Sequence, residues 1–457
     1  MVGGAAGAQV MMVLAAPLLT RLYSPDDFGL LAVYTGLLGL FTVIASLRYE
    51  LAIPLPEDDQ EAANLVILCL LMVLGITSVS ALLVWLAGDA ITRALGVPML
   101  APYFWLLPIG VLLVGIYQTF NYWAIRTKQF PAITRTRIRQ AFTTTGIQLL
   151  AFKAGGVALL LGHAGGQGMG SITLGRAALA RPELRLWSWQ GVRFVARRYR
   201  RFPIFSTWSD FFNAAGQQLP PLMFAALFSA GAAGLYALAH RVLSMPMSVI
   251  GQAVAGVFFA NAADAYREGR LGPLVSKVHD KLAQIAMPPA LVLMVTGPEL
   301  FTLVFGEQWR QAGEFARWMA PWLYMTFITY PLGTLFPVME KQRQGMFFHT
   351  VLVLARAAAI AAGAWYGDLV MTVILFSFVS VICWIGFLVW IALSAGNTLG
   401  MILKPTCRIL VISLLCVSPL WLGMHWPMAS PIWWLTLLAS ASLIGWHYFR
   451  LFQKTCQ

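Results

Sequence analysis

Four basic residues lie within stretches that are otherwise apolar enough to cross a bilayer: Lys153, Arg176, Arg241 and Arg356. A charged side chain at the centre of a membrane costs roughly 2.5–3.5 kcal/mol on insertion scales. At most two anions occupy comparable positions, so the cations outnumber the carboxylates that could neutralise them. The usual reason to keep such cations is a water-filled cavity that receives an anionic substrate. The sequence therefore predicts a cationic substrate-binding cavity built from these four residues.

Their expected depths differ. Lys153, Arg241 and Arg356 are expected near the middle of their spans, whereas Arg176 lies about five residues from the end of its span, where a long side chain can reach the interface. A structural ion pair or a helix-end contact is the alternative for each. The two anions, Glu299 and Asp210, could pair with a cation or take up a coupling proton. Interfacial residues at helix ends would look the same in sequence, so both interpretations stay open.

Signatures of catalysis and of metal binding are missing. The chain contains no GxxxxGK[ST], no HExxH and no CxxC pattern, so we expect no catalytic residues, no metal and no cofactor. The formal net charge of +13 could indicate nucleic-acid binding in a soluble protein. Here the basic residues fall in short connections between apolar runs, so we expect no nucleic-acid partner.

Composition indicates a helical membrane protein. Residues are 59% hydrophobic and 11% charged, with a mean hydropathy of +0.74, whereas soluble domains are about 45–50% apolar and about 25% charged. A span needs about 20 apolar residues. The expected fold class is an all-α polytopic membrane protein, with about fourteen spans at 3–20, 28–47, 64–87, 100–124, 141–162, 165–181, 205–230, 232–260, 281–306, 313–338, 346–366, 368–393, 406–423 and 431–450.

The distribution of basic residues supports this count. With both termini in the cytoplasm, the cytoplasmic connections hold 23 of the 31 Lys and Arg residues and the outside connections hold 4. The remaining four are the cations inside the spans. Such an asymmetry follows the positive-inside rule. The first residues lack the basic region of a signal peptide, so the first span is expected to be retained.

The longest connection divides the chain. Residues 182–204, RPELRLWSWQGVRFVARRYRRFP, are basic and aromatic, and either lie along an anionic inner leaflet or serve as a plain linker. They separate six-span bundles at 1–181 and 205–393, followed by two further spans at 394–457. The bundles echo one another at an offset of 205, where five residues of 22–32 match residues of 227–237. Six-span repeats are expected to be parallel.

Three segments carry a family resemblance. RLYSPDDFGLLAVYTGLLGLFTVIASLRYELAIPLPEDDQEA at 21–62 resembles the N-terminal region of bacterial oligosaccharide flippases. These form the polysaccharide-transporter branch of the multidrug/oligosaccharidyl-lipid/polysaccharide exporter superfamily. Further matches lie at 199–254 and 304–333. The resemblance implies two six-helix bundles around a central cationic cavity, working by alternating access in the bacterial inner (cytoplasmic) membrane.

The resemblance also implies a cargo. This would be a polyprenyl-pyrophosphate-linked oligosaccharide, carried to the periplasmic leaflet for O-antigen, capsule or exopolysaccharide assembly. A polysaccharide polymerase and glycosyltransferases are further expected partners, and the basic segment 182–204 adds anionic inner-leaflet lipids. A peptidoglycan-precursor flippase and a multidrug antiporter remain alternatives, although cationic drugs favour buried carboxylates. An integral glycan polymerase or ligase is disfavoured because the expected outside loops are very short.

Overall fold

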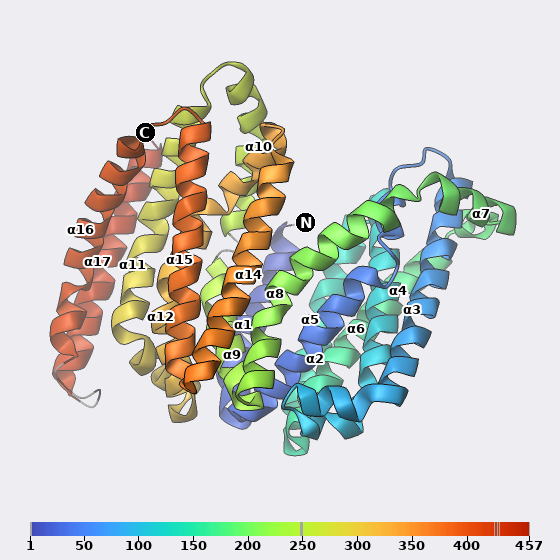
Figure 1. Cartoon of the computed structure of the whole chain (residues 1–457), viewed down its shortest axis with the longest axis horizontal. Helices are drawn as coiled ribbons and strands as arrows, with labels where there is room; N and C mark the ends of the chain where they lie inside the picture. The colour runs from blue at the N-terminus through green and yellow to red at the C-terminus, as the bar shows by residue number, and fades with distance from the viewer. Residues whose placement is uncertain (1, 247–249, 425, 427, 429, 457) are drawn as a thin grey trace. The chain divides into compact units, whose positions relative to one another are not determined.

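The computed structural model describes residues 2–246, 250–424, 426, 428 and 430–456, and no strand occurs in this described part of the chain. The all-α fold class predicted from the sequence is confirmed (Figure 1). The helices of the N-terminal half are α1 (Val2–Leu22), α2 (Pro25–Ile44), α3 (Asp59–Ala94), α4 (Leu106–Arg126), α5 (Phe130–Leu150), α6 (Gly156–Leu179), α7 (Trp189–Arg198), α8 (Thr207–Leu227) and α9 (Ala230–Pro246). Those of the C-terminal half are α10 (Gln252–Arg267), α11 (Leu271–Phe305), α12 (Arg310–Thr329), α13 (Leu335–Val338), α14 (Gln342–Tyr366), α15 (Leu369–Ser394), α16 (Leu399–Gly423) and α17 (Pro431–Cys456).

Long apolar helices account for much of the chain. Within the described residues, seven are long and apolar enough to cross a membrane by length and composition: α2, α3, α4, α11, α14, α15 and α16. Other long helices, such as α5 and α12, carry more polar residues. The expected eighth span, 232–260, is covered by α9 and α10, and its residues 247–249 lie outside the described part. The count of fourteen crossings stays a prediction.

The chain forms two compact units, the first at Met1–Ala237 and the second at Leu238–Gln457. The six-span bundles expected on either side of 182–204 stay a prediction, and α8 lies in the first compact unit. The reason is that α8 packs along α2: a methyl group added to Gly36 would lie 3.2 Å from Leu222 Cδ2. A methyl group added to Gly39 would lie 2.8 Å from Gln218 Nε2.

The prediction of a fifth span at 141–162 is wrong. The helix α5 instead runs from Phe130 to Leu150, and the chain turns at residues 151–155 before α6 begins. Gly155 has a φ of +61°, a left-handed value that favours glycine and ends the turn. Hydropathy did not reveal this turn, because the residues on both sides of it are apolar. The basic first half of α5 also lowers the mean hydropathy there, so that the helix was predicted to start too late.

Glycines let α6, which covers most of the predicted span 165–181, pack closely against α5. Gly162, Gly166 and Gly170 recur every four residues on one face of α6 and lie against α5. A methyl group on Gly166 would clash with Thr144 Oγ1, and one on Gly170 would clash with the amide of Gln140. Small residues at this spacing let two helices approach closely in a membrane, where van der Waals packing drives their association.

The internal echo corresponds to a reciprocal contact within the first unit. A methyl group on Gly29 of α2 would clash with the carbonyl oxygen of Ala230, and one on Gly234 of α9 would clash with that of Pro25. Adding 205 to Gly29 and Pro25 gives Gly234 and Ala230, so the two contacts are equivalent under the repeat. Both helices also begin with a serine cap: Ser24 Oγ accepts from the Asp27 N–H at 3.2 Å, and Ser229 Oγ accepts from the Ala232 N–H at 3.1 Å. The repeat therefore has a structural basis at this crossing.

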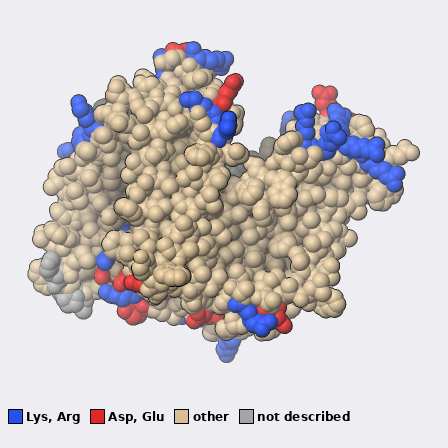
Figure 2. Space-filling view, viewed as in Figure 1, with Lys and Arg blue, Asp and Glu red and all other residues tan. Residues whose placement is uncertain are grey.

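Charged residues gather at the ends of the helices. In the view of Figure 2, Lys, Arg, Asp and Glu lie mainly at the two ends of each unit's helices, and the surface between the ends is almost free of them. Such a surface fits the hydrocarbon core of a bilayer. Which end faces the cytoplasm remains the prediction drawn from the basic residues.

Candidate functional site

Arg356 occupies a defined site within the second unit. It lies near the middle of α14, as the sequence predicts, and its Nε donates a hydrogen bond to Ser380 Oγ of α15 at 2.9 Å. Ser380 is fully buried and its Oγ donates to the Phe376 carbonyl oxygen at 2.7 Å. The guanidinium carbon lies 4.6 Å from the centroid of the Trp322 ring and 5.2 Å from that of Phe376. Cation–π contact and the hydrogen bond together fix the guanidinium plane.

Helix α9 extends this site. The His240 ring stacks on Trp322 with a centroid separation of 5.9 Å and an interplanar angle of 17°. Its neighbour Arg241 is exposed and lies five residues before Pro246, the last residue of α9. The predicted mid-depth position of Arg241 depends on the span 232–260, of which residues 247–249 lie outside the described part, so it stays a prediction. The second unit thus brings Arg356 and His240 together through one indole, with Arg241 next to His240 in sequence.

The structure separates the other two predicted cations. Lys153 is exposed in the short turn Phe152–Ala154 between α5 and α6, so its predicted mid-depth position is wrong. Arg176 is exposed in the last turn of α6, in agreement with its expected position near a span end. The two therefore lie at opposite ends of α6 and do not form one site.

Sequence reasoning missed three arginines in α5. Arg135, Arg137 and Arg139 were assigned to a connection, but they lie inside the helix and are exposed. Arg139 is nine residues from the start of α5, which corresponds to about 13 Å along the axis. Arg135 and Arg139 share one face, roughly opposite the buried Ile133. The signal that could have found them is Pro131, since proline in the first turn marks a helix start.

Glu299 lies in a paired environment. It follows a kink in α11, where Thr296 has non-helical dihedral angles beside Pro298. Its carboxylate lies 3.4 Å from Arg310 Nη2 and 3.9 Å from Arg317 Nη2, both on α12. The structure thus pairs Glu299 with arginines, and its role in ion coupling stays a prediction.

Asp210 also pairs with an arginine. Its Oδ2 lies 2.8 Å from Arg48 Nε, and Arg48 Nη1 lies 3.2 Å from the carboxylate of Glu50. Glu50 is fully buried and accepts a short hydrogen bond from Ser46 Oγ, yet nothing in its sequence context singled it out. Leu47 and Arg48 both have positive φ values, 50° and 61°, which is strained for residues with a side chain. The break between α2 and α3 is thus held by a partly buried network of charges.

The chemistry of these arrangements suits the binding of anions. Each unit places arginines within helices whose other residues are apolar or uncharged, and the described carboxylates Glu299, Asp210 and Glu50 are paired with arginines other than Arg356, Arg135 and Arg139. Guanidinium groups suit phosphate oxygens because their donors form a planar fork.

One family model matches more than half of the chain. The family described as "Polysaccharide biosynthesis protein" matches residues 18–314. The succinoglycan biosynthesis transport protein ExoT of Rhizobium meliloti (strain 1021) is 24% identical over 398 residues, which cover 84% of this chain and 76% of that protein.

Two solved structures share the fold. The lipid II flippase MurJ in an inward closed conformation has a TM-score of 0.77 at 10% identity, covering 99% of each chain. An inward-facing multidrug resistance MATE family transporter of the MOP superfamily has a TM-score of 0.70 at 13% identity, covering 85% of this chain and 94% of the other. At these identities the likeness is one of fold.

Proposed function

Because the chain belongs to the polysaccharide biosynthesis protein family, we propose that it moves polyprenyl-pyrophosphate-linked oligosaccharide between membrane leaflets for cell-surface polysaccharide assembly. The family resemblance predicted from residues 21–62 and from the two later segments is confirmed, and the chain is a multi-pass membrane protein of a transporter fold. The direction of movement is from the cytoplasmic to the periplasmic leaflet of the bacterial inner membrane. ExoT, a relative by sequence, is named as a transport protein of succinoglycan biosynthesis.

The observation that carries the proposal is the Arg356 site. A pyrophosphate cannot enter hydrocarbon without an environment that replaces its hydration. Arg356 offers a guanidinium at mid-helix whose plane is set by Ser380 and Trp322, so its donors are oriented before the ligand arrives. Arg241, exposed one residue after His240, supplies a second charge on α9. A preset planar donor binds phosphate oxygens with less loss of side-chain entropy than a freely rotating lysine.

The first unit contributes in a different way. Arg135 and Arg139 form an exposed basic face on α5, which attracts the same anionic group through charge in a hydrated setting. The sugar moves with its hydroxyl groups in water, and the polyprenyl tail stays in lipid. Coupling to an ion gradient at Glu299 or Asp210 stays a prediction, and it would require opening the ion pairs described above.

Export by a deletion strain tests the proposal. The strain lacking this chain, with its own glycosyltransferases and polymerase intact, should accumulate lipid-linked oligosaccharide in the cytoplasmic leaflet and export none. The parent chain should restore export and the Arg356→Ala variant should not, at equal membrane abundance. Lys153→Ala is the matched control, because Lys153 is an exposed turn residue.

Reconstitution separates the alternatives. Vesicles containing the purified chain should move a fluorescent polyprenyl-pyrophosphate oligosaccharide. Movement of the peptidoglycan precursor at the same rate, or proton-driven efflux of a cationic dye with no glycan movement, would contradict the proposed cargo.

Topology can be tested separately. A reporter that is active only in the periplasm should be silent when fused after the last residue and active when inserted at the Lys153 turn. The basis is the concentration of basic residues in the connections assigned to the cytoplasm. The reverse pattern would contradict the proposed direction of transport.

A further inference from the structure

The short helix α7 has two chemically distinct faces. Its inner face buries Val192 and Val195, which join a hydrophobic core with residues of α3 and α4, including Leu65 and Trp123. Its outer face carries Arg193, Phe194 and Arg197, all of them exposed. The residues of a helix lying on an interface separate in this way. The helix does not cross the membrane, since it has only ten residues.

Hydrogen bonds fix the rotation of α7 about its axis. The Ser188 N–H, at the helix start, donates to Asn64 Oδ1 of α3 at 2.8 Å. Tyr49 Oη donates to the Ala196 carbonyl oxygen at 3.0 Å, and Arg198 Nη1 lies 3.0 Å from Glu61 Oε2. Gly191 packs so tightly on Asn64 that a methyl group there would clash. Because these contacts prevent α7 from rotating, Arg193, Phe194 and Arg197 stay on its exposed side.

Large aromatic side chains accompany the outward arginines. Phe194 is 57% exposed and Trp189 is 59% exposed. The rings of Trp187 and Trp189 form a T-shaped pair with a centroid separation of 5.5 Å. Exposed aromatic residues have no advantage in water, but Trp is enriched at membrane interfaces, where its ring meets the headgroups. Figure 1 shows α7 beside the start of α3, at one end of the helices of the first unit.

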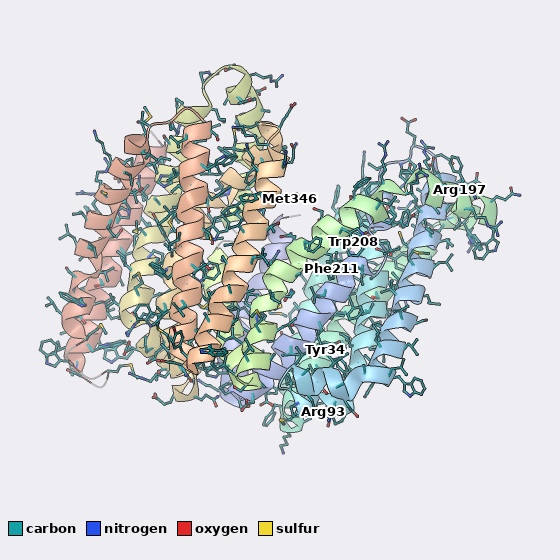
Figure 3. All side chains as sticks on the ribbon, viewed as in Figure 1. Tyr34, Arg93, Arg197, Trp208, Phe211 and Met346 are labelled. Carbon is teal, nitrogen blue, oxygen red and sulfur yellow. The ribbon has the colours of Figure 1, made fainter. Side chains whose placement is uncertain are left out.

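Charge in this segment is almost entirely positive. Residues 181–201 contain seven arginines and one acidic residue, Glu183. Arg198 is paired with Glu61, whereas Arg193 and Arg197 project from the outer face, and Figure 2 shows a basic patch at this corner (Arg197 is labelled in Figure 3). The patch is therefore complementary to a surface of negative charge.

We propose that α7, with Trp187 before it, is a docking surface for the anionic headgroups of the leaflet at which the first unit's helices end. Arg193 and Arg197 bind the phosphate groups, and Trp189 and Phe194 enter the headgroup layer beside them. An acidic protein would complement the charge equally well, but it would leave the aromatic side chains without an apolar partner. Position at the helix ends and aromatic character together favour lipid. This surface acts independently of the proposed cargo.

Lipid titration of the full-length protein tests this surface. Purified protein in detergent is titrated with phosphatidylglycerol or phosphatidylcholine, and bound lipid is measured by native mass spectrometry. One basic residue near an anionic surface contributes about a fivefold effect. The double variant Arg193→Gln/Arg197→Gln should therefore bind phosphatidylglycerol about 25-fold more weakly, with no change for phosphatidylcholine. The exposed positions of both residues leave folding intact, which thermal unfolding checks.

Arg93→Gln is the matched control. Arg93 is an exposed arginine of the first unit at the opposite end from Arg197 (Figure 3), so its loss should leave phosphatidylglycerol binding unchanged. Trp189→Ala/Phe194→Ala should weaken the binding of both lipids. The proposal is overturned if the double arginine variant binds phosphatidylglycerol as the parent does, or if Arg93→Gln weakens binding equally. It is also overturned if only the binding of an acidic peptide, such as polyglutamate, is lost.

Discussion

Arg356 on α14 and the arginines of α5 are two ways of keeping a cation inside a helical membrane unit. Arg356 is partly buried, hydrogen-bonded to Ser380 and placed over the rings of Trp322 and Phe376. Arg135 and Arg139 are exposed on a helix whose opposite face packs against α6 through glycines. A cation that has lost water needs fixed partners, whereas an exposed cation needs only a scaffold that presents it.

The difference bears on ligand binding. An oriented guanidinium in a low-dielectric site interacts strongly and with a defined geometry, while an exposed charge interacts weakly and is screened by salt. The Arg356 site therefore suits recognition of the pyrophosphate, and the α5 face suits its attraction. Four substitutions test this contrast.

Arg356→Ala should have the largest effect. Hydrogen bonds to charged groups contribute about 1.5–3 kcal/mol, so the transport rate should fall roughly 10- to 100-fold. Arg356→Lys should recover only part of this, because a lysine cannot reproduce the bond from Nε or the planar contact with Trp322. The rate is measured with reconstituted protein. Parental transport by a normally abundant Arg356→Ala protein would remove the distinction between the two regions.

Gly166→Ala should destabilise the scaffold that presents the α5 arginines. The added methyl group meets Thr144 Oγ1 and lies 3.1 Å from the Gln140 carbonyl oxygen, so we expect a loss of about 1–3 kcal/mol. Thermal unfolding in detergent measures the loss, and Thr144→Ala should restore part of it. Gly146→Ala on α5 is the control, because nothing lies within 4 Å of a methyl group there. Equal effects of Gly166→Ala and Gly146→Ala would argue against the packing explanation.

Arg135→Gln/Arg139→Gln should reduce transport more modestly. An exposed unit charge contributes about 1 kcal/mol at close range in water, so we expect roughly a fivefold reduction per interacting charge. The reduction should shrink at high ionic strength, whereas that of Arg356→Ala should persist. The salt dependence of transport by both variants is the measurement. If the loss of transport shrank equally with salt in both variants, the contrast between the Arg356 site and the α5 face would be contradicted.

Lys153→Ala should have the smallest effect. An exposed turn residue away from other features changes stability by less than about 0.5 kcal/mol, and transport should be unchanged. A loss of glycan export at normal abundance would return Lys153 to the list of substrate-binding residues.

Much of the fold could be predicted from the sequence because apolar runs of sufficient length have few alternatives to a membrane helix. Arg356 was also predictable, since α14 is apolar on both sides of it. The failure at α5 has a specific cause: a hydropathy average cannot tell a basic connection from a basic helix. Arginine is a good helix former, and Pro131 starts the helix within the basic run.

By itself, the sequence determined the all-α membrane class, the family and the repeat that relates Gly29 to Gly234. The class follows from composition and the family from sequence motifs. The repeat depends on glycines that leave room for a neighbouring helix. Only the tertiary structure decided which charges are held and by what. Ser380 and Trp322 contact Arg356 from two other helices, and His240 of a third helix stacks on Trp322. Asp210 of α8 pairs with Arg48, which also pairs with the nearby Glu50. The environment of a charge is set by atoms close in space, and in this chain most of those atoms are far apart in sequence.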